Sequence, residues 1–264
     1  MKIIVCIKQV PDTTEVKMDP KTGTLIREGI PVIINPDDKA GLEAAILLKE
    51  QYGATVTVLS MGPLQAETAL KEAYAMGADR VILLSDRAFA GSDTLATSRA
   101  LAYAIKKIDY DVIICGRQAI DGDTAQVGPQ IAEFLNLPQI SYVTHIEKQS
   151  DSLIVKKQFE DKYQKIKVKL PCLLTVLKEM NTPRYMSIDR IFEVCKNKIV
   201  EKFTISDIGL NPIKTGLKAS PTQVKKVMTK DAKKLGKLHE LDDRESANLI
   251  VEKLKEKFII GESI

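Results

Sequence analysis

The chain has 264 residues, of which 44% are hydrophobic and 28% are charged. This size allows a substantial core, arranged as one large α/β domain or as two smaller ones. The net charge of +4 creates no strong field toward a polyanion, so no nucleic acid is expected as a partner. No stretch approaches the ~20 apolar residues that a membrane helix needs, so no membrane span is expected.

The cysteines and histidines indicate neither a disulfide framework nor a metal site. The four cysteines are widely spaced and form no C-x-x-C pair. His145 and His239 fit no metal-ligand spacing and complete no Ser/His/Asp or Cys/His arrangement. We therefore expect a cytoplasmic protein in which no metal is bound and no residue acts as a catalytic acid, base or nucleophile.

Short apolar runs alternate with segments of helical period along the first half of the chain. The apolar runs, expected to be buried parallel strands, cover residues 2–7, 55–59, 80–84 and 111–115. The helical segments cover residues 38–51, 64–76 and 94–108 and a stretch that ends near Leu135. This alternation predicts an α/β fold with a doubly wound, mostly parallel sheet of the Rossmann-like or nucleotide-hydrolase-like kind.

Capping residues support the boundaries of two of these helices. The sequence Asn35-Pro36-Asp37 precedes the first helix and makes Asp37 a candidate cap, while Gly53 follows its end. Asp93 is the candidate cap of the helix that begins at Thr94.

The second half of the chain follows a different pattern. Four shorter segments are expected to be antiparallel strands added to the sheet, namely residues 139–147, 153–160, 162–170 and 172–177. Residues 207–212 and 215–221 resemble a linker, and a last amphipathic helix is expected over 243–258, with Leu249, Ile250, Leu254 and Phe258 on one side. We thus expect a nucleotide-binding domain over residues 1–200 and a C-terminal linker and helical arm over 201–264, which packs on another subunit.

The stretch from Cys115 to Gln130 narrows the function most. A buried strand ends at a glycine and leads through small and polar residues into a helix, which leaves backbone N–H groups at the carboxyl edge of the sheet. Two helix starts are compatible with the sequence: Asp123 caps a helix beginning at Thr124, or the helix begins at Gly128-Pro129 after an irregular cradle. The carboxylates of Asp121 and Asp123 suit ribose or ribityl hydroxyls, and a capping loop without a ligand is the alternative.

Three other strand ends are expected to meet this loop and to form a crevice with it, namely residues 6–12, 60–63 and 91–94. Lys8 is placed either to pair with a phosphate or to form an ion pair with Asp12. Gly62 either allows close approach of a ligand or serves as a turn glycine. Neither a phosphate loop of the G-x-x-x-x-G-K-[ST] type nor a G-x-G-x-x-G motif occurs, so the chain depends on cofactor chemistry or on none.

The chain resembles the small (beta) subunit of electron transfer flavoprotein. The resemblance is carried by residues 7–12, 35–37, 59–63, 118–130 and 181–185. It implies a heterodimer with a larger alpha subunit that carries FAD, and a crevice in this chain that holds AMP or a second FAD. The form of residues 119–129 is similar to the electron-bifurcating branch, in which NADH reduces the FAD of the beta subunit. Electrons then pass to an acyl-CoA dehydrogenase through the alpha-subunit FAD, and to ferredoxin or flavodoxin.

The resemblance also implies the site residues. Cofactor contacts are expected at Cys6, Asn35, Leu59, Ser60, Met61, Gly62, Asp93, Thr94, Thr97, Gly116, Ala119, Ile120, Asp121, Gly122, Asp123, Thr124, Ala125, Gln126, Val127, Gly128, Pro129 and Gln130. Among these, Asp93, Thr94 and Thr97 would lie near the flavin ring. Arg117 either stabilises a reduced anionic flavin or forms a surface ion pair.

Partner recognition is expected at Tyr185, Met186 and Ile188, which match the family's loop for acyl-CoA dehydrogenases. The alternative for Ile188 is a core position of a helix through Ile191 and Val194. Two other functions remain open: a subunit that holds AMP structurally, and an ATP-consuming enzyme of the nucleotide-hydrolase-like fold. The Ser-Gly-Gly-x-Asp-Ser loop of such enzymes is replaced here by residues 8–12.

Overall fold

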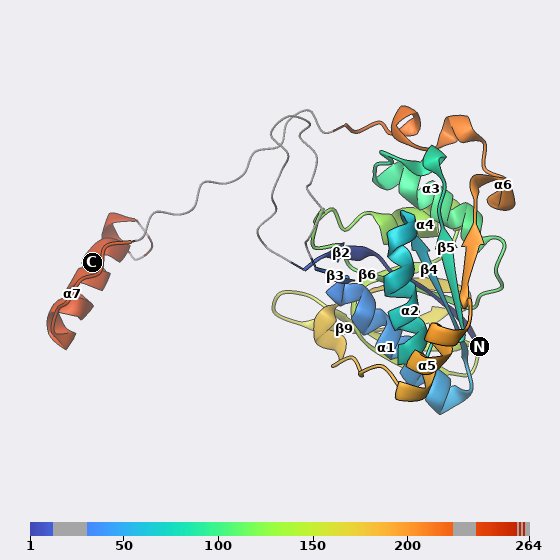
Figure 1. Cartoon of the computed structure of the whole chain (residues 1–264). Helices are drawn as coiled ribbons and strands as arrows, with labels where there is room; N and C mark the ends of the chain where they lie inside the picture. The colour runs from blue at the N-terminus through green and yellow to red at the C-terminus, as the bar shows by residue number, and fades with distance from the viewer. Residues whose placement is uncertain (13–30, 224–235, 258, 260, 262–264) are drawn as a thin grey trace. The chain divides into compact units, whose positions relative to one another are not determined.

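A computed structural model describes residues 1–12, 31–223, 236–257, 259 and 261 (Figure 1). Contacts divide the chain into one unit from Met1 to Lys226 and another from Val227 to Ile264. Within the described part of the first unit, nine strands form one sheet in the order β11-β5-β4-β1-β6-β10-β7-β8-β9. These strands are β1 Lys2–Cys6, β4 Thr55–Met61, β5 Arg80–Leu84, β6 Val112–Gly116, β7 Gln139–Gln149, β8 Ser152–Gln158, β9 Tyr163–Lys169, β10 Cys172–Val176 and β11 Val200–Phe203.

Helices cover both faces of this sheet (Figure 1). The helices of the first unit are α1 Pro36–Tyr52, α2 Glu67–Met76, α3 Thr94–Ile105, α4 Val127–Leu135, α5 Ile188–Lys196 and α6 Ile205–Ile208. Because side chains alternate along a strand, Ile3 and Val5 of β1 pack with α1 and α2, whereas Ile4 and Cys6 pack with α3 and α4. The predicted doubly wound, mostly parallel fold is confirmed.

The added strands differ in part from the expectation. The two pairs β7–β8 and β8–β9 are antiparallel, as predicted. However, β10 lies between β6 and β7 and is parallel to both. All five residues of β10 are buried, which is typical of an inner strand of a parallel sheet that is covered on both faces.

The segment after residue 200 is not the expected linker. β11 pairs in parallel with β5 and forms the edge of the sheet. α6 follows, with a capping box between Thr204 and Asp207, and Ile208 and Leu210 are buried against the α3 side. The prediction overlooked these elements because each contains only four residues, too few to show a period. The α/β unit therefore extends beyond the expected boundary at residue 200.

The second unit contains α7, Asp243–Glu256, which begins at the cap Asp242. None of its residues is buried, and Ile250 and Val251 are exposed. Phe258, predicted to share the apolar side of this helix, lies outside the described residues. Across the described residues, no helix combines the length and apolar character required to cross a membrane.

Candidate functional site

The first turn of α1 binds the ends of three neighbouring strands through two buried carboxylates. Asp38 accepts hydrogen bonds from the backbone N–H of Lys8, at 2.8 Å, and of Gly116, at 2.9 Å. Asp37 accepts one from the N–H of Lys178, at 3.0 Å. These donors follow or end β1, β6 and β10, which are adjacent in the sheet. Burial raises the pKa of Asp38 to about 7, against the effect of its hydrogen bonds.

The predicted role of Asp37 as the helix cap was therefore wrong. Pro36 occupies the first turn of α1 and makes Asn35 the N-cap, although its side chain forms no capping bond. Instead the buried Asn35 amide donates to the Gln118 carbonyl, at 2.8 Å, and accepts from the Ile120 N–H, at 3.1 Å. Asn35 thus holds the start of the loop that follows β6.

This loop, residues 117–126, is irregular up to the start of α4 at Val127. The second of the two predicted helix starts is therefore correct to within one residue. The capping box expected between Asp123 and Gln126 is absent, because Gln126 is itself the N-cap and its side chain forms no capping bond. Asp123 and Ala125 have φ of 49° and 52°, the left-handed region that costs energy for residues other than glycine. The first-turn N–H groups of α4 are thus left without a side-chain cap beside a strained loop.

The amino ends of α3 and α4 are joined by side-chain hydrogen bonds. Thr94 donates to the amide oxygen of Gln126, and Ser98 donates to that of Gln130, both at 2.9 Å. Ser98 is fully buried and was not predicted as part of the site. The sequence indicates Ser98 only indirectly. It places a hydroxyl on the otherwise apolar side of α3, and a buried hydroxyl needs a hydrogen-bond partner. Gly128 packs on β10 so closely that a Cβ would lie 2.6 Å from Thr175 Cγ2.

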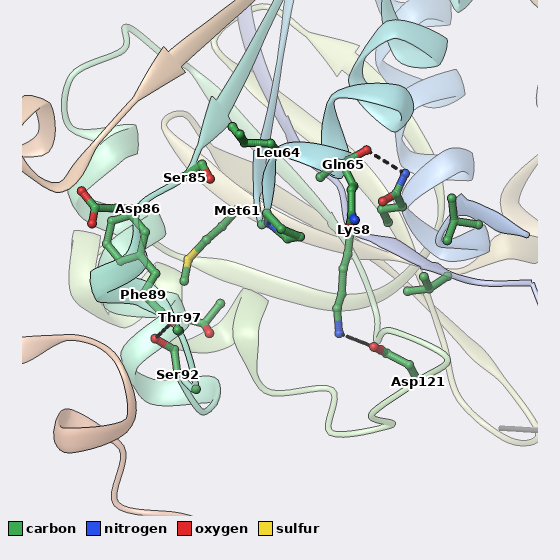
Figure 2. Close-up of a pocket in the computed structure, with 18 of the residues that line it drawn as sticks. Lys8, Met61, Leu64, Gln65, Ser85, Asp86, Phe89, Ser92, Thr97 and Asp121 are labelled. Atoms are coloured by element: carbon green, nitrogen blue, oxygen red, sulfur yellow. Dashed lines mark hydrogen bonds and ion pairs between the residues drawn. The ribbon is translucent and has the colours of Figure 1, made fainter. Parts of the chain in front are cut away.

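A cavity of about 1080 Å³ opens at the carboxyl ends of β4 and β5 (Figure 2). Met61 extends into it toward Thr97, and Phe89 lies on the same side. On the other side, Lys8 forms an ion pair with Asp121, with Nζ 2.7 Å from Oδ1. The protein partner of Lys8 is therefore Asp121 and not Asp12, and a contact with a phosphate stays a prediction. The pair is the point at which the cavity and the loop after β6 meet.

The structure brings part of the predicted set to this cavity. The predicted residues that line it are Met61, Gly62, Thr97 and Asp121. The remaining residues of the loop and of the α4 start continue from Asp121 along the same edge, and Cys6, Leu59 and Ser60 are buried in the strands below. Gly91 and Ser92 of the expected crevice also line it, but other parts of the lining were not predicted: they come from residues 64–66 and from residues 85–90 of the loop between β5 and α3. Because β5 neighbours β4, that loop reaches the same edge.

Asp93 and Arg117 have protein partners in this structure. Asp93 caps α3 by accepting from the Ala96 N–H, and its other oxygen accepts two hydrogen bonds from Thr222. Arg117 Nε lies 3.5 Å from Asp37 Oδ2. Arg117 thus forms an ion pair, which was the alternative considered for it, and its partner Asp37 is buried. A role of Arg117 in tuning the flavin stays a prediction.

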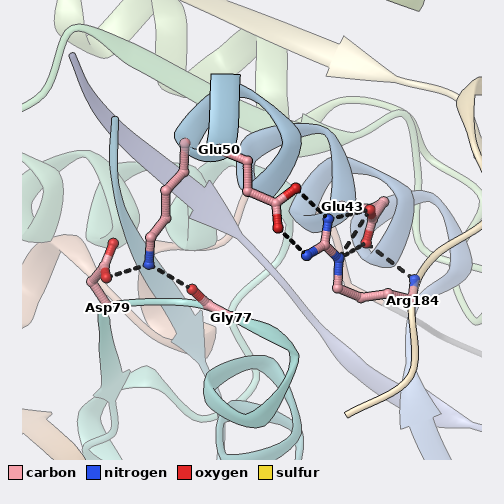
Figure 3. A network of polar contacts seen from close by, with 6 residues as sticks. Glu43, Glu50, Gly77, Asp79 and Arg184 are labelled. Carbon is pink, nitrogen blue, oxygen red and sulfur yellow. Dashed lines mark hydrogen bonds and ion pairs between the residues drawn. The ribbon is translucent and has the colours of Figure 1, made fainter. Parts of the chain in front are cut away.

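The predicted partner-binding residues are exposed. Tyr185 is 97%, Met186 45% and Ile188 71% exposed, so the alternative core position for Ile188 is wrong. The start of this segment is anchored to α1, because Arg184 forms ion pairs with Glu43 and Glu50 (Figure 3). Such bidentate contacts between a guanidinium and a carboxylate fix the geometry of the side chains as well as stabilising them.

Comparison with known proteins identifies the family of the chain. The sequence pattern of the electron transfer flavoprotein domain matches residues 22–206. The chain belongs to the electron transfer flavoprotein family. It is 56% identical over 260 residues to an electron transfer flavoprotein subunit beta of Clostridium acetobutylicum, covering 98% of this chain and 100% of that protein.

Two further relatives of this flavoprotein subunit carry more specific names. It is 53% identical to the caffeyl-CoA reductase-Etf complex subunit CarD of Acetobacterium woodii, over 98% of this chain and 100% of the relative. It is 46% identical to the acryloyl-CoA reductase electron transfer subunit gamma of Anaerotignum propionicum, again over 98% and 100%.

The contact between Gly116 and the start of α1 generates a prediction about stability. A Cβ at Gly116 would lie 2.2 Å from Asp38 Oδ1 and 2.8 Å from the Asp38 backbone nitrogen. Gly116→Ala should therefore lower the free energy of unfolding by about 2 kcal/mol or more, because it separates β6 from α1. Urea unfolding followed by circular dichroism measures this change.

Gly122→Ala is the matched control, since a Cβ at Gly122 meets nothing within 4 Å. Its free energy of unfolding should stay within about 1 kcal/mol of the original chain, with any change stabilising. Equal stability of the two variants would contradict the role assigned to Gly116.

Proposed function

We propose that this beta subunit of a heterodimeric electron transfer flavoprotein binds FAD in the crevice formed by the cavity and the loop after β6, and works in the cytoplasm. A bound FAD would accept hydride from NADH and pass single electrons to the alpha-subunit FAD, which serves an acyl-CoA dehydrogenase, and to ferredoxin or flavodoxin. The protein's own contribution is to bind, orient and shield the cofactor.

The size and position of the cavity carry this proposal. Ligand pockets usually enclose about 300–1,000 Å³, and the volume of about 1080 Å³ is slightly above that range. A mononucleotide such as AMP would fill only part of it. Met61, Leu64 and Phe89 supply apolar surface suited to an aromatic ring, while Ser85 and Ser92 supply hydroxyls.

The charges at the loop also suit a dinucleotide. The negative charges of Asp121 and Asp123 would oppose a phosphate, but Lys8 pairs with Asp121 and the Gln118 amide donates to Asp123, at 2.7 Å. Their fields are thereby reduced, and the uncapped N–H groups of α4 provide the positive end of a helix dipole to a pyrophosphate. The remaining lone pairs of the Asp121 and Asp123 carboxylates can accept hydrogen bonds from the hydroxyls of the ligand.

The names of the relatives support the choice of partner. One relative is named as a subunit of a caffeyl-CoA reductase complex and another as an electron transfer subunit of an acryloyl-CoA reductase, so both names include an enzyme that acts on a CoA ester. We propose the same class of partner here, with Tyr185, Met186 and Ile188 as its contact surface.

The number of flavins tests the proposal against its main alternative, in which the crevice holds AMP. The heterodimer with the alpha subunit should release two FAD molecules on acid denaturation, because this chain adds one to that of its partner. Chromatography of the released nucleotides with absorbance at 450 nm provides the count. One FAD with one AMP per heterodimer would contradict FAD binding and support the AMP alternative.

The exposed Ile188 generates a second prediction. An apolar anchor at the centre of a contact usually contributes more than 1 kcal/mol, so Ile188→Ala should slow electron transfer to the acyl-CoA dehydrogenase by about tenfold at subsaturating partner. The flavin content should not change, because Ile188 does not line the cavity. Stopped-flow reoxidation of the reduced heterodimer measures the rate.

Ile213→Ala is the matched control, because Ile213 is 80% exposed on a different segment of the chain. The proposed surface is wrong if the Ile188 variant transfers electrons at the normal rate, or if both variants lose the same amount.

A further inference from the structure

A strap of residues 216–222 is bound to the outer side of the loop between β5 and α3, residues 85–93. Leu217 N–H donates to the Ala90 carbonyl, at 3.1 Å. Ser220 Oγ accepts from the Asp93 N–H, at 2.9 Å. Thr222 donates its N–H and its hydroxyl to Asp93 Oδ2, at 3.0 Å and 2.7 Å. The strap thus contacts the loop along most of its length.

The strap and the loop pack too closely to slide along one another. Gly216 has φ of 69°, and a Cβ there would lie 2.5 Å from the Ala88 carbonyl oxygen. Gly91 has φ of 73°, and a Cβ there would lie 3.0 Å from Leu217 Cβ. Because both approaches require glycine, the loop and the strap must move together or separate.

The inner side of the same loop forms a wall of the cavity. Ser85, Phe89 and Ser92 from this loop line it, as does Thr97 from the first turns of α3 (Figure 2). Asp93 stands between the two sides, because one oxygen caps α3 and the other binds Thr222. A displacement of the strap would therefore move the wall against which a ligand rests.

The strap is also the last described part of the first unit before the chain continues into the second unit with α7. α7 has no buried residue, and its exposed Ile250 and Val251 need a surface, which we assign to the partner subunit. We propose that Asp93 is a positioning residue that couples partner binding through the C-terminal arm to ligand binding in the cavity. This inference rests on the proposed function.

The coupling is measured as a ratio of two dissociation constants. The alpha subunit is titrated onto the full-length chain without nucleotide and with saturating FAD, and by linkage the ratio equals the effect of the partner on FAD binding. We expect FAD to tighten the heterodimer by about fivefold or more in the original chain. In Thr222→Val, which removes the hydroxyl bond to Asp93, the ratio should fall to about twofold or less.

Thr204→Val is the matched control, since the Thr204 hydroxyl bonds to Asp207 within its own segment. It should keep the ratio of the original chain, and thermal unfolding should show that both variants remain folded. Three results would each overturn the coupling. They are an unchanged ratio in Thr222→Val, an equal fall in Thr204→Val, and a ratio near one in the original chain with FAD bound. Absence of FAD binding in the original heterodimer would instead overturn the proposed function, and the titration repeated with AMP then decides the coupling.

Discussion

The Asp38 carboxylate is the contact on which the rest of this site depends. It is buried at the start of α1 and accepts hydrogen bonds from the N–H groups of Lys8 and Gly116 at the ends of two adjacent strands. A buried carboxylate is costly unless it is hydrogen-bonded, and a buried N–H is costly without an acceptor, so the three groups stabilise one another. This contact helps to fix the direction in which the chain leaves β1 and β6.

The directions set at Asp38 determine what reaches the edge of the sheet. Lys8 continues toward the cavity and meets Asp121, while the loop after Gly116 is held by Asn35 and then enters α4. The strained residues Asp123 and Ala125 are therefore supported from both ends. A rim that is held by contacts within the protein loses less conformational entropy when it binds a ligand.

The sequence predicted those features that rest on local pattern. Continuous apolar runs identified β1, β4, β5 and β6, and the glycine at the end of β6 located the loop. Contacts between distant residues were not predictable in this way, because nothing in the pattern around Asp37 or Lys8 indicates Lys178 or Asp121 as partner. The four short segments after Pro138 gave no indication of spatial order, so the insertion of β10 between β6 and β7 was missed.

The central claim is that the loop after β6 and the start of α4 bind the pyrophosphate and sugar of a nucleotide. Hydrogen exchange of the backbone amides of residues 124–128, measured in the heterodimer with this subunit's nucleotide bound and removed, tests it most directly. The account predicts that exchange of these amides becomes at least about tenfold slower when the nucleotide is bound, because they gain an acceptor. Unchanged exchange there, with slowing confined to other segments of the bound subunit, would contradict it.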